Sequence, residues 1–242
     1  MKLNHSLRNQ TFVVTGSAEG FGYQLALKMN ELGASLILID KQLKKLKELE
    51  AKLFSDDHQK NICLAMDFLG TTYDDYYSAS KIIEKNFTTI DGIIFNAAML
   101  GSLSPLIHYE PLTWAKTFQV NVHSNFLIYK TMFTLLNPSK VTTLIFVLGP
   151  EIDDFKPNWG AYAITKKTQK AMLDLIALEN HDTLVRSFGI IPQPMNTGLR
   201  RQAYPGANND KLPPPQKNIE AILSLISSPL LYKNGQTLKV DY

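Results

Sequence analysis

Tyr162 and Lys166 are the two residues of this 242-residue sequence best suited to acid–base chemistry. They stand four residues apart in a segment with a helical pattern, so both side chains lie on one helix face. A cation beside a phenol favours the phenolate and lowers the pKa of the tyrosine towards working pH. Such a phenol can exchange a proton with an alcohol or a carbonyl oxygen. Because this spacing is common by chance, a purely structural pair is the alternative.

A glycine-rich turn near the start of the chain has the composition of a phosphate-binding loop. Gly16, Gly20 and Gly22 follow an apolar run and precede a helical pattern. Glycines let the backbone turn tightly and approach a ligand closely, and the N–H groups that open the next helix attract phosphate. This placement predicts a dinucleotide pyrophosphate site, with a structural turn as the alternative. The predicted binding residues are Gly16, Ser17, Glu19, Gly20, Phe21 and Gly22.

Acidic residues near this turn favour NAD(H) as the cofactor. Asp40 ends the second apolar run, where an acid accepts hydrogen bonds from the adenosine ribose and repels a 2′-phosphate. Glu19 adds a second negative charge. Lys41 is a flexible cation that could meet a 2′-phosphate, so NADP(H) stays open. A simple helix-capping role for Asp40 is compatible with either cofactor.

Short apolar runs alternate with helical patterns along the chain. The predicted strands cover residues 11–15, 35–39, 61–66, 92–95, 142–148 and 185–190, and a strand-like run covers 237–240. The predicted helices cover residues 21–32, 41–54, 73–87, 112–136, 162–179 and 218–226. This repetition predicts an α/β fold with a parallel, doubly wound sheet and helices on both faces. No linker divides the chain, so a single domain over residues 1–242 is expected.

One irregular region interrupts this alternation. Residues 192–215 contain six prolines, which disfavour long helices and strands. The region follows a late strand and is expected to lie over the carboxyl edge of the sheet. We interpret it as a substrate lid, with a plain surface loop as the alternative.

The composition excludes several other classes of protein. With 45% hydrophobic and 19% charged residues, the chain can bury a sizeable core. A net charge of +3, from 25 basic and 22 acidic side chains, indicates neither a nucleic acid nor a membrane as partner. The five histidines are scattered without ligand spacing, so no metal site is expected.

The sequence also indicates a cellular compartment. Residues 1–10 lack the apolar core of a signal peptide, and no run approaches about 18 uninterrupted apolar residues. The single cysteine, Cys63, cannot form an internal disulfide. We therefore expect a protein of the reducing cytoplasm.

Taken together, these motifs resemble the short-chain dehydrogenase/reductase family. The spacing Gly-x-x-x-Gly-x-Gly, preceded by Thr15, is similar to the family fingerprint and differs from the Gly-x-Gly-x-x-Gly of long-chain enzymes. Tyr162 and Lys166 follow the fifth strand, where the family carries its catalytic pair. The resemblance covers nearly the whole chain and is strongest to bacterial members with no assigned substrate. It implies a Rossmann-type fold and an NAD(P)(H)-dependent oxidoreductase that transfers hydride between nicotinamide and a small alcohol or ketone.

The resemblance also implies roles for individual residues. Tyr162 exchanges the proton with the substrate oxygen, Lys166 binds the nicotinamide ribose and lowers the pKa of Tyr162, and Asn121 holds a water of the proton relay. Asp67 contacts the adenine. Tyr162 is expected to contact the cofactor as well, and the other implied cofactor contacts are Phe68, Asn96, Ala97, Pro192 and Thr197.

Two positions depart from the family pattern. Gly149 stands where the family has a serine that hydrogen-bonds the substrate oxygen, and losing such a donor costs on the order of 10²–10³ in rate. Ser102 and Ser104 are the nearest hydroxyls by topology, and Gly149→Ser is predicted to raise activity if only this donor is missing. Gln193 replaces a glycine near the nicotinamide. These departures support the alternative of a catalytically impaired dinucleotide-binding or scaffold protein.

Family members usually assemble through the two long helices that follow the fourth and fifth strands. Those helices are predicted here over residues 112–136 and 162–179, and their apolar content permits such an interface. A homodimer or a homotetramer is therefore expected.

Overall fold

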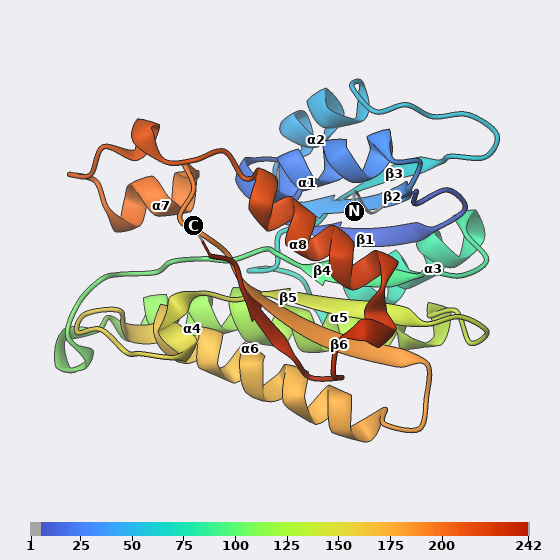
Figure 1. Ribbon diagram of the computed structural model, residues 1–242. Helices are drawn as coiled ribbons and strands as arrows, with labels where there is room; N and C mark the ends of the chain where they lie inside the picture. Colours follow the sequence, from blue (N-terminus) through green and yellow to red (C-terminus); the bar gives the residue numbers. More distant parts are fainter. Residues whose placement is uncertain (1–5, 242) are drawn as a thin grey trace.

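The computed structural model describes residues 6–241 and is built around one parallel β-sheet (Figure 1). Its strands are β1 (Thr11–Thr15), β2 (Ser35–Asp40), β3 (Asn61–Ala65), β4 (Gly92–Phe95), β5 (Thr142–Val147), β6 (Val185–Ile191) and β7 (Thr237–Lys239). Their order is β3-β2-β1-β4-β5-β6-β7, and every neighbouring pair is parallel. The order reverses between β1 and β4, which creates the crevice where ligands of such sheets bind. The predicted doubly wound sheet is confirmed.

Helices cover both faces of the sheet (Figure 1). One layer contains α1 (Gly20–Glu31), α2 (Leu43–Glu50) and α8 (Gln216–Ser227). The opposite layer contains α3 (Tyr73–Asn86), α4 (Pro111–Phe118), α5 (Ser124–Met132) and α6 (Gly160–Glu179). A further short helix, α7 (Gly198–Ala203), stands apart from both layers beyond one end of the sheet.

Alternating side chains of the central strands explain why both faces need covering. Along β1, Phe12 and Val14 join the core on the side of α1, where they meet Leu25. Val13 points the other way and joins the core that includes Ile83 of α3. Because successive residues of a strand face opposite sides, an all-apolar strand must be buried between two helix layers.

The prediction of one continuous helix over residues 112–136 is wrong. The structure divides it into α4, a π-helical turn η2 (Gln119–His123), α5 and a short 3₁₀ segment η3 (Phe133–Leu135). At the π turn, Asn121 accepts a hydrogen bond from the N–H of Met99 at 2.7 Å and donates one to the carbonyl of Met99 at 2.9 Å. These bonds tie the helix to the segment after β4, and π turns of this kind are frequent at functional sites.

The predicted helix over residues 41–54 is shorter in the structure, where α2 ends at Glu50. The amide of Asn30 holds the backbone of Phe54, accepting from its N–H at 2.8 Å and donating to its carbonyl at 2.9 Å. This bond pair turns the chain away from the helix axis before β3 begins. The other predicted elements agree with the structure to within two residues at each end.

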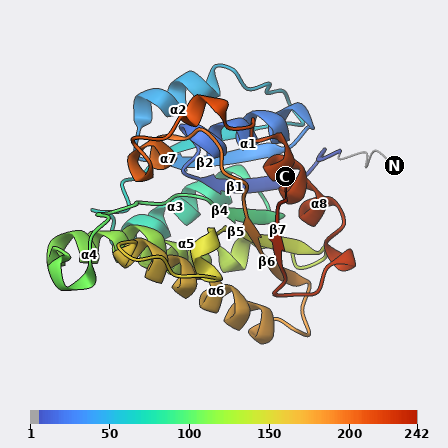
Figure 2. The same ribbon diagram turned by 60° about the vertical axis from the view of Figure 1, so that its left-hand side comes forward.

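The irregular region 192–215 lies at the carboxyl edge of the sheet, as predicted. It contains α7 and a single 3₁₀ turn, η5 (Asn209–Lys211), so its regular elements are short. Figure 2 brings the side of the molecule that carries α7 and α4 forward. The region's role as a lid stays a prediction, as do the domain bounds 1–242, of which residues 1–5 and 242 lie outside the described part.

Two searches of the described residues bear on partners. Between residues 6 and 241, no helix is both long and apolar enough to cross a membrane. Within the same range, no group of three or more histidine, cysteine, aspartate or glutamate side chains is arranged to hold a metal ion.

Candidate active site

A cavity of about 820 Å³ opens at the carboxyl ends of the strands. It extends from the glycine turn before α1 to the start of α6, and α7 forms one of its walls. Most of the residues that the sequence assigned to the site line this one cavity: Gly16, Glu19, Gly20, Phe21, Asp40, Asp67, Phe68, Asn96, Ala97, Tyr162, Lys166, Pro192 and Thr197. The cavity therefore lies at the switch point of the sheet, where open α/β folds bind their ligands.

The glycine turn is held tightly against the end of β4. Gly16 has a φ of +64°, and a Cβ atom there would lie 2.8 Å from the Cα of Ala97. A Cβ atom on Gly22 would overlap the carbonyl oxygen of Gly16. Only glycine fits at these two positions, because one needs a left-handed backbone and the other allows no side chain. Helix α1 begins at Gly20 without a side-chain cap, so its first N–H groups are available to a phosphate.

Asn96 braces this turn. Its side-chain amide donates to the carbonyls of Thr15 at 3.0 Å and Gly16 at 2.9 Å. The hydroxyl of Thr15 in turn accepts from the backbone N–H groups of Asn96 and Ala97, at 3.0 and 3.1 Å. The same hydroxyl donates to the carbonyl of Ile94 at 3.3 Å, so five hydrogen bonds fix the turn to the end of β4 before any ligand binds.

Three predicted site residues do not line the cavity: Ser17, Gly22 and Asn121. Ser17 is buried beneath the turn, and its hydroxyl donates to the carbonyl of Ile39 at 3.5 Å. Asn121 is buried behind α6, and besides Met99 its amide donates to the hydroxyl of Thr165 at 2.9 Å. Both residues support the walls of the cavity.

Asp40 is at the end of β2, but its carboxylate is engaged by the protein. One oxygen accepts from the N–H of Ala18 and the other from the N–H of Gln42, each at 3.0 Å. Asp40 thus ties the glycine turn to β2 while one side of it faces the cavity. Glu19, the second acid at this end, is ion-paired with Lys45 of α2. Its hydrogen bond with Lys45 holds the pKa of Glu19 below the ordinary value.

Asp67 and Phe68 form the wall beyond β3. The carboxylate of Asp67 accepts from the N–H of Leu69 at 3.2 Å, which shapes the turn after the strand. Phe68 stacks on Tyr76 of α3 with ring centroids 5.9 Å apart. Both residues line the cavity from the side where the sequence predicts the adenine.

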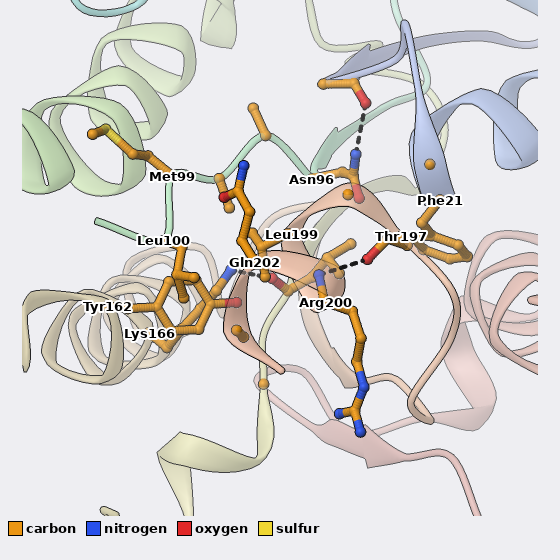
Figure 3. A pocket seen from close by; sticks show the side chains of 18 of the residues that line it. Phe21, Asn96, Met99, Leu100, Tyr162, Lys166, Thr197, Leu199, Arg200 and Gln202 are labelled. Carbon is orange, nitrogen blue, oxygen red and sulfur yellow. Dashed lines mark hydrogen bonds between the residues drawn. The ribbon is translucent and has the colours of Figure 1, made fainter. Parts of the chain in front are cut away.

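Tyr162 and Lys166 stand at the opposite end of the cavity from the glycine turn. Figure 3 shows the two side chains next to each other, with Phe21 and Thr197 on the far side. The Nζ atom of Lys166 lies 5.5 Å from the centroid of the Tyr162 ring. The same Nζ donates to the carbonyl of Val147 at 2.7 Å, which anchors the lysine at the end of β5.

The pKa of Tyr162 differs from the expectation. The sequence predicts that Lys166 lowers it, whereas in the structure burial raises the pKa of Tyr162 above its ordinary value, with smaller contributions from Glu151 and Tyr204. Burial also lowers the pKa of Lys166 to about 8. The reason is that both side chains are almost fully buried, and low polarity disfavours the phenolate and the ammonium alike.

Glu151 is a cavity residue that the sequence analysis did not identify. It lies on η4 (Pro150–Ile152), a single 3₁₀ turn directly after β5, and its carboxyl group is buried beside the Tyr162 and Lys166 pair. A carboxylate four residues beyond the end of a central strand is the signal that could have indicated it. Of the two hydroxyls expected to compensate for Gly149, Ser102 lines the cavity and Ser104 does not.

The segment after β6 holds α7 over the cavity. Thr197 caps this helix, its hydroxyl accepting from the N–H of Arg200 at 3.2 Å (Figure 3). Gln193, which replaces the family's glycine, is buried and fixed by Asn218 of α8, whose amide accepts from its N–H at 2.8 Å and donates to its carbonyl at 3.2 Å. Both bonds use the backbone of residue 193, so they anchor this turn to the body of the domain independently of the Gln193 side chain.

The wall around Tyr162 is mainly apolar. Its members are Leu100, Trp159, Leu199, Ala203 and Tyr204, which pack together with the phenol ring. Trp159 lies between the other two aromatics, with ring centroids 5.8 Å from both Tyr162 and Tyr204. A substrate that reaches the phenol must displace or lie against these side chains.

Comparison with known proteins identifies the family of this chain. A model of the family described as short chain dehydrogenase matches residues 10–208. The chain belongs to the short-chain dehydrogenase family. The matched region includes the glycine turn, the whole of α6 and the cavity wall up to α7. Members of this family are oxidoreductases that bind a nicotinamide dinucleotide.

Bacterial short-chain dehydrogenases are among the most similar proteins. The oxidoreductase YciK of Escherichia coli (strain K12) is 27% identical over 231 residues, which cover 96% of this chain and 91% of that protein. The 5-keto-D-gluconate 5-reductase of the same strain is 24% identical over 247 residues, covering 98% and 95%.

Solved structures of short-chain dehydrogenases share the whole fold. A short chain dehydrogenase from Salmonella enterica serovar Typhi superposes with a TM-score of 0.91 at 26% identity, covering 100% of both chains. A protein from Escherichia coli CFT073 complexed with NADPH gives 0.90 at 26%, covering 99% and 100%. A protein from Shigella flexneri complexed with NADP gives 0.89 at 25%, covering 98% and 99%. The Rossmann-type fold expected from the sequence is confirmed.

Proposed function

We propose that this short-chain dehydrogenase transfers hydride between NAD(H) and a small ketone or alcohol, with Tyr162 as the general acid and base. The observation that carries the proposal is the single cavity that joins the glycine turn to the phenol of Tyr162. A pyrophosphate at one end would leave room for a nicotinamide at the other. The cofactor supplies the hydride, and the protein supplies orientation and the proton.

The residues of the cavity fit a dinucleotide. Gly16 and Gly22 let the turn pack closely against the end of β4, and the first N–H groups of α1 open onto the cavity at Gly20 and Phe21. Lys166 would contact the nicotinamide ribose from the end of β5, where its hydrogen bond to Val147 places its Nζ atom. Asp67 and Phe68 would border the adenine, and Thr197 the nicotinamide end.

Asp40 supports NAD(H) as the preferred form of the cofactor. Its carboxylate is fixed at the end of β2 by two N–H groups, where the ribose of adenosine would lie. A 2′-phosphate there would be repelled. Two observations favour NADP(H) instead. Similar proteins have been solved in complex with NADP and NADPH, and Lys41 on the cavity wall could pair with a 2′-phosphate. Titration with NADH and with NADPH, read by nicotinamide fluorescence, distinguishes them, and a lower Kd for NADPH would contradict the preference.

The apolar wall suggests the kind of substrate. Leu100, Trp159 and Tyr204 surround the phenol, so the body of the substrate next to its carbonyl group is expected to be apolar or aromatic. A panel of ketones that contrasts aromatic and aliphatic members with polyhydroxylated ones tests this expectation. Faster turnover of the polyhydroxylated ketones would contradict it.

The activity itself is tested with NADH and the same carbonyl panel. Tyr162→Phe removes one hydroxyl from the cavity and leaves the ring in its packing. We expect turnover in the wild type, its loss in Tyr162→Phe, and the same NADH affinity in both proteins. Turnover that persists in Tyr162→Phe would remove this residue from the proposed mechanism.

A second candidate function is dinucleotide binding without turnover. The observation in its favour is the burial of Tyr162, whose side chain is 7% exposed beneath the apolar wall. A protein of this kind would bind NADH tightly and reduce no member of the panel, and α7 would stay closed over the phenol.

We also propose that the protein forms a homodimer or a homotetramer through α5 and α6. Helix α6 exposes Leu175 and Leu178, and the segment from α5 to η3 exposes Phe126 and Phe133. Large apolar side chains gathered on two neighbouring helices are typical of a self-association surface.

A further inference from the structure

The carboxyl group of Glu151 lies in the space that a side chain at position 149 would fill. A Cβ atom built on Gly149 would overlap the Oε2 atom of Glu151, and the three heavy atoms nearest to it, the adjacent residues apart, all belong to the Glu151 carboxyl group. The backbone of Gly149, with a φ of −153°, is extended and suits any residue. The nearest obstacle to a side chain at position 149 is therefore the carboxyl group of Glu151, the end of a flexible side chain.

The fold brings this carboxyl group back over the end of β5. The chain leaves the strand through Gly149 and Pro150 into η4, where the N–H of Ile152 donates to the carbonyl of Gly149 at 3.2 Å. This tight turn directs Glu151 into the cavity, where it is 6% exposed. The family's serine would project into the same place from position 149.

The Oε2 atom of Glu151 is buried and has no hydrogen-bond partner among the described residues. Lys166, the nearest candidate for an ion pair, donates its hydrogen bond to Val147 instead. A buried polar atom without a partner is costly, and it indicates a role for a ligand that is to bind there. An ionised carboxylate in this position would be costlier still.

We infer that, within the proposed reaction, the carboxyl group of Glu151 replaces the missing serine hydroxyl and donates a hydrogen bond to the substrate oxygen. A neutral carboxyl group carries one O–H donor, as a serine does. Its position beside Tyr162 lets both groups reach one oxygen atom of a bound carbonyl compound. The inference rests on the proposed function, because it assigns a second donor to the same reaction.

The surroundings of Glu151 favour the neutral form. Burial raises its pKa above the ordinary value for a glutamate. A hydrogen bond from its own backbone N–H opposes this rise most, followed by Lys166 on α6 and Lys156 on the loop after η4. Tyr162 on α6 and Tyr204, directly after α7, are the other titratable groups at this wall, and burial raises the pKa of Tyr162. A carboxylic acid kept neutral by an apolar site can act as a hydrogen-bond donor at working pH.

Glu151 has the same protonation state before and after the reaction. When a carbonyl compound is reduced, the hydride reaches its carbon from the nicotinamide and the proton reaches its oxygen from Tyr162. Glu151 keeps its proton and only stabilises the charge that develops on the oxygen. Its contribution should disappear when the carboxyl group ionises, so the rate should fall as the pH rises through the pKa of Glu151.

Three variants test the inference with NADH and the carbonyl panel. Glu151→Ala removes the donor and should lower kcat about 100-fold or more. Glu151→Gln has the same shape and an N–H donor, so it should retain most of kcat and lose the fall in rate at high pH. The double variant Gly149→Ser/Glu151→Ala clears the carboxyl group and supplies the family's hydroxyl, so it should recover most of the activity.

Asp153→Ala, which removes an exposed acid from the same turn, is the control and should behave as the wild type. Circular dichroism and NADH affinity check that each variant is folded. A second readout needs no turnover: ¹³C NMR of carboxyl-labelled glutamate should contain one resonance, absent from Glu151→Gln, that titrates well above the others.

The outcomes separate the inference from the function on which it rests. Turnover in the wild type that is unchanged in folded Glu151→Ala, or a resonance of Glu151 that titrates with the other glutamates, overturns the inference alone. No turnover in the wild type or in any variant, with NADH still bound, overturns the proposed function and the inference with it.

Discussion

Glu19 in the glycine turn and Lys45 on α2 form an ion pair next to the cavity. In this pair the ammonium group of Lys45 is engaged by the carboxylate of Glu19. Both side chains are about half exposed, so the pair contributes little to stability. The pair affects the choice between NADH and NADPH, because a lysine that is already paired is less available to a 2′-phosphate.

Glu19→Gln should therefore shift the cofactor preference towards NADPH. The substitution removes the negative charge that holds Lys45, and the freed ammonium can approach a 2′-phosphate. An exposed pair of this kind corresponds to about 0.2–1 kcal/mol, so the ratio of the Kd values for NADH and NADPH should change by roughly 1.4- to fivefold. Fluorescence titration of both cofactors measures this ratio.

The matched control is Glu50→Gln, which frees Lys47 on the same helix from its partner at 2.7 Å. Lys47 does not line the cavity. An equal shift in both variants would mean that net charge, and not the position of Lys45, sets the preference.

The parts of the fold that could be predicted from the sequence are those fixed by local pattern. The all-apolar run of β1 requires a strand covered on both faces, and the glycine spacing after it requires a turn that allows no side chain at Gly22. Tyr162 and Lys166 share a helix face because of their spacing alone. Each of these features depends on residues that are neighbours along the chain.

The features that could not be predicted depend on contacts between distant segments. The π turn at Asn121 arises from its bonds to Met99, 22 residues away in sequence. The direction of the pKa shift of Tyr162 is set by burial beneath α7, which the sequence does not reveal. Likewise, the expectation that Gly149→Ser alone raises activity took no account of Glu151, whose carboxyl group occupies the space for the new hydroxyl.

Asn121→Ala should destabilise the protein by about 2–4 kcal/mol. The substitution leaves the backbone N–H and carbonyl of Met99 and the hydroxyl of Thr165 without their partner in a buried region. Urea denaturation followed by circular dichroism measures the free energy of unfolding. Asn208→Ala, at an exposed asparagine, is the control and should change it by less than about 0.5 kcal/mol. A loss below about 1 kcal/mol for Asn121→Ala would show that water replaces these bonds.

Leu178→Arg should dissociate the homo-oligomer proposed above. Leu178 on α6 is 70% exposed, and a charge at this position would have to be buried without a partner in the interface. Sedimentation velocity should detect a smaller species than in the wild type. Leu230→Arg is the matched control, because Leu230 on η6 (Pro229–Leu231) is equally exposed but lies outside α5 and α6. A wild type that is monomeric at all concentrations would contradict the proposal.

The free energy of unfolding should depend less on pH in Glu151→Gln than in the wild type. Well below pH 4, the carboxyl group of Glu151 is protonated in both the folded and the unfolded protein, so the two proteins should differ least towards the acid end of the range. Burial raises the pKa of Glu151 in the folded state. As the pH rises through this raised pKa, the folded wild type binds more protons than the unfolded chain and loses stability. The amide in Glu151→Gln does not ionise, so this loss of stability is absent from the variant.

Urea midpoints of the two proteins between pH 4 and 7.5 measure this difference. The range stops there because Lys166, with its pKa lowered to about 8, titrates above it. Asp153→Asn removes one exposed acid from the same turn and controls for the change in net charge. We expect the advantage of Glu151→Gln over the wild type to grow steadily with pH, and Asp153→Asn to show no such gain. If the midpoints of Glu151→Gln and the wild type run parallel, the carboxyl group of Glu151 ionises as readily in the folded protein as in the unfolded chain, and it is not the neutral donor inferred here.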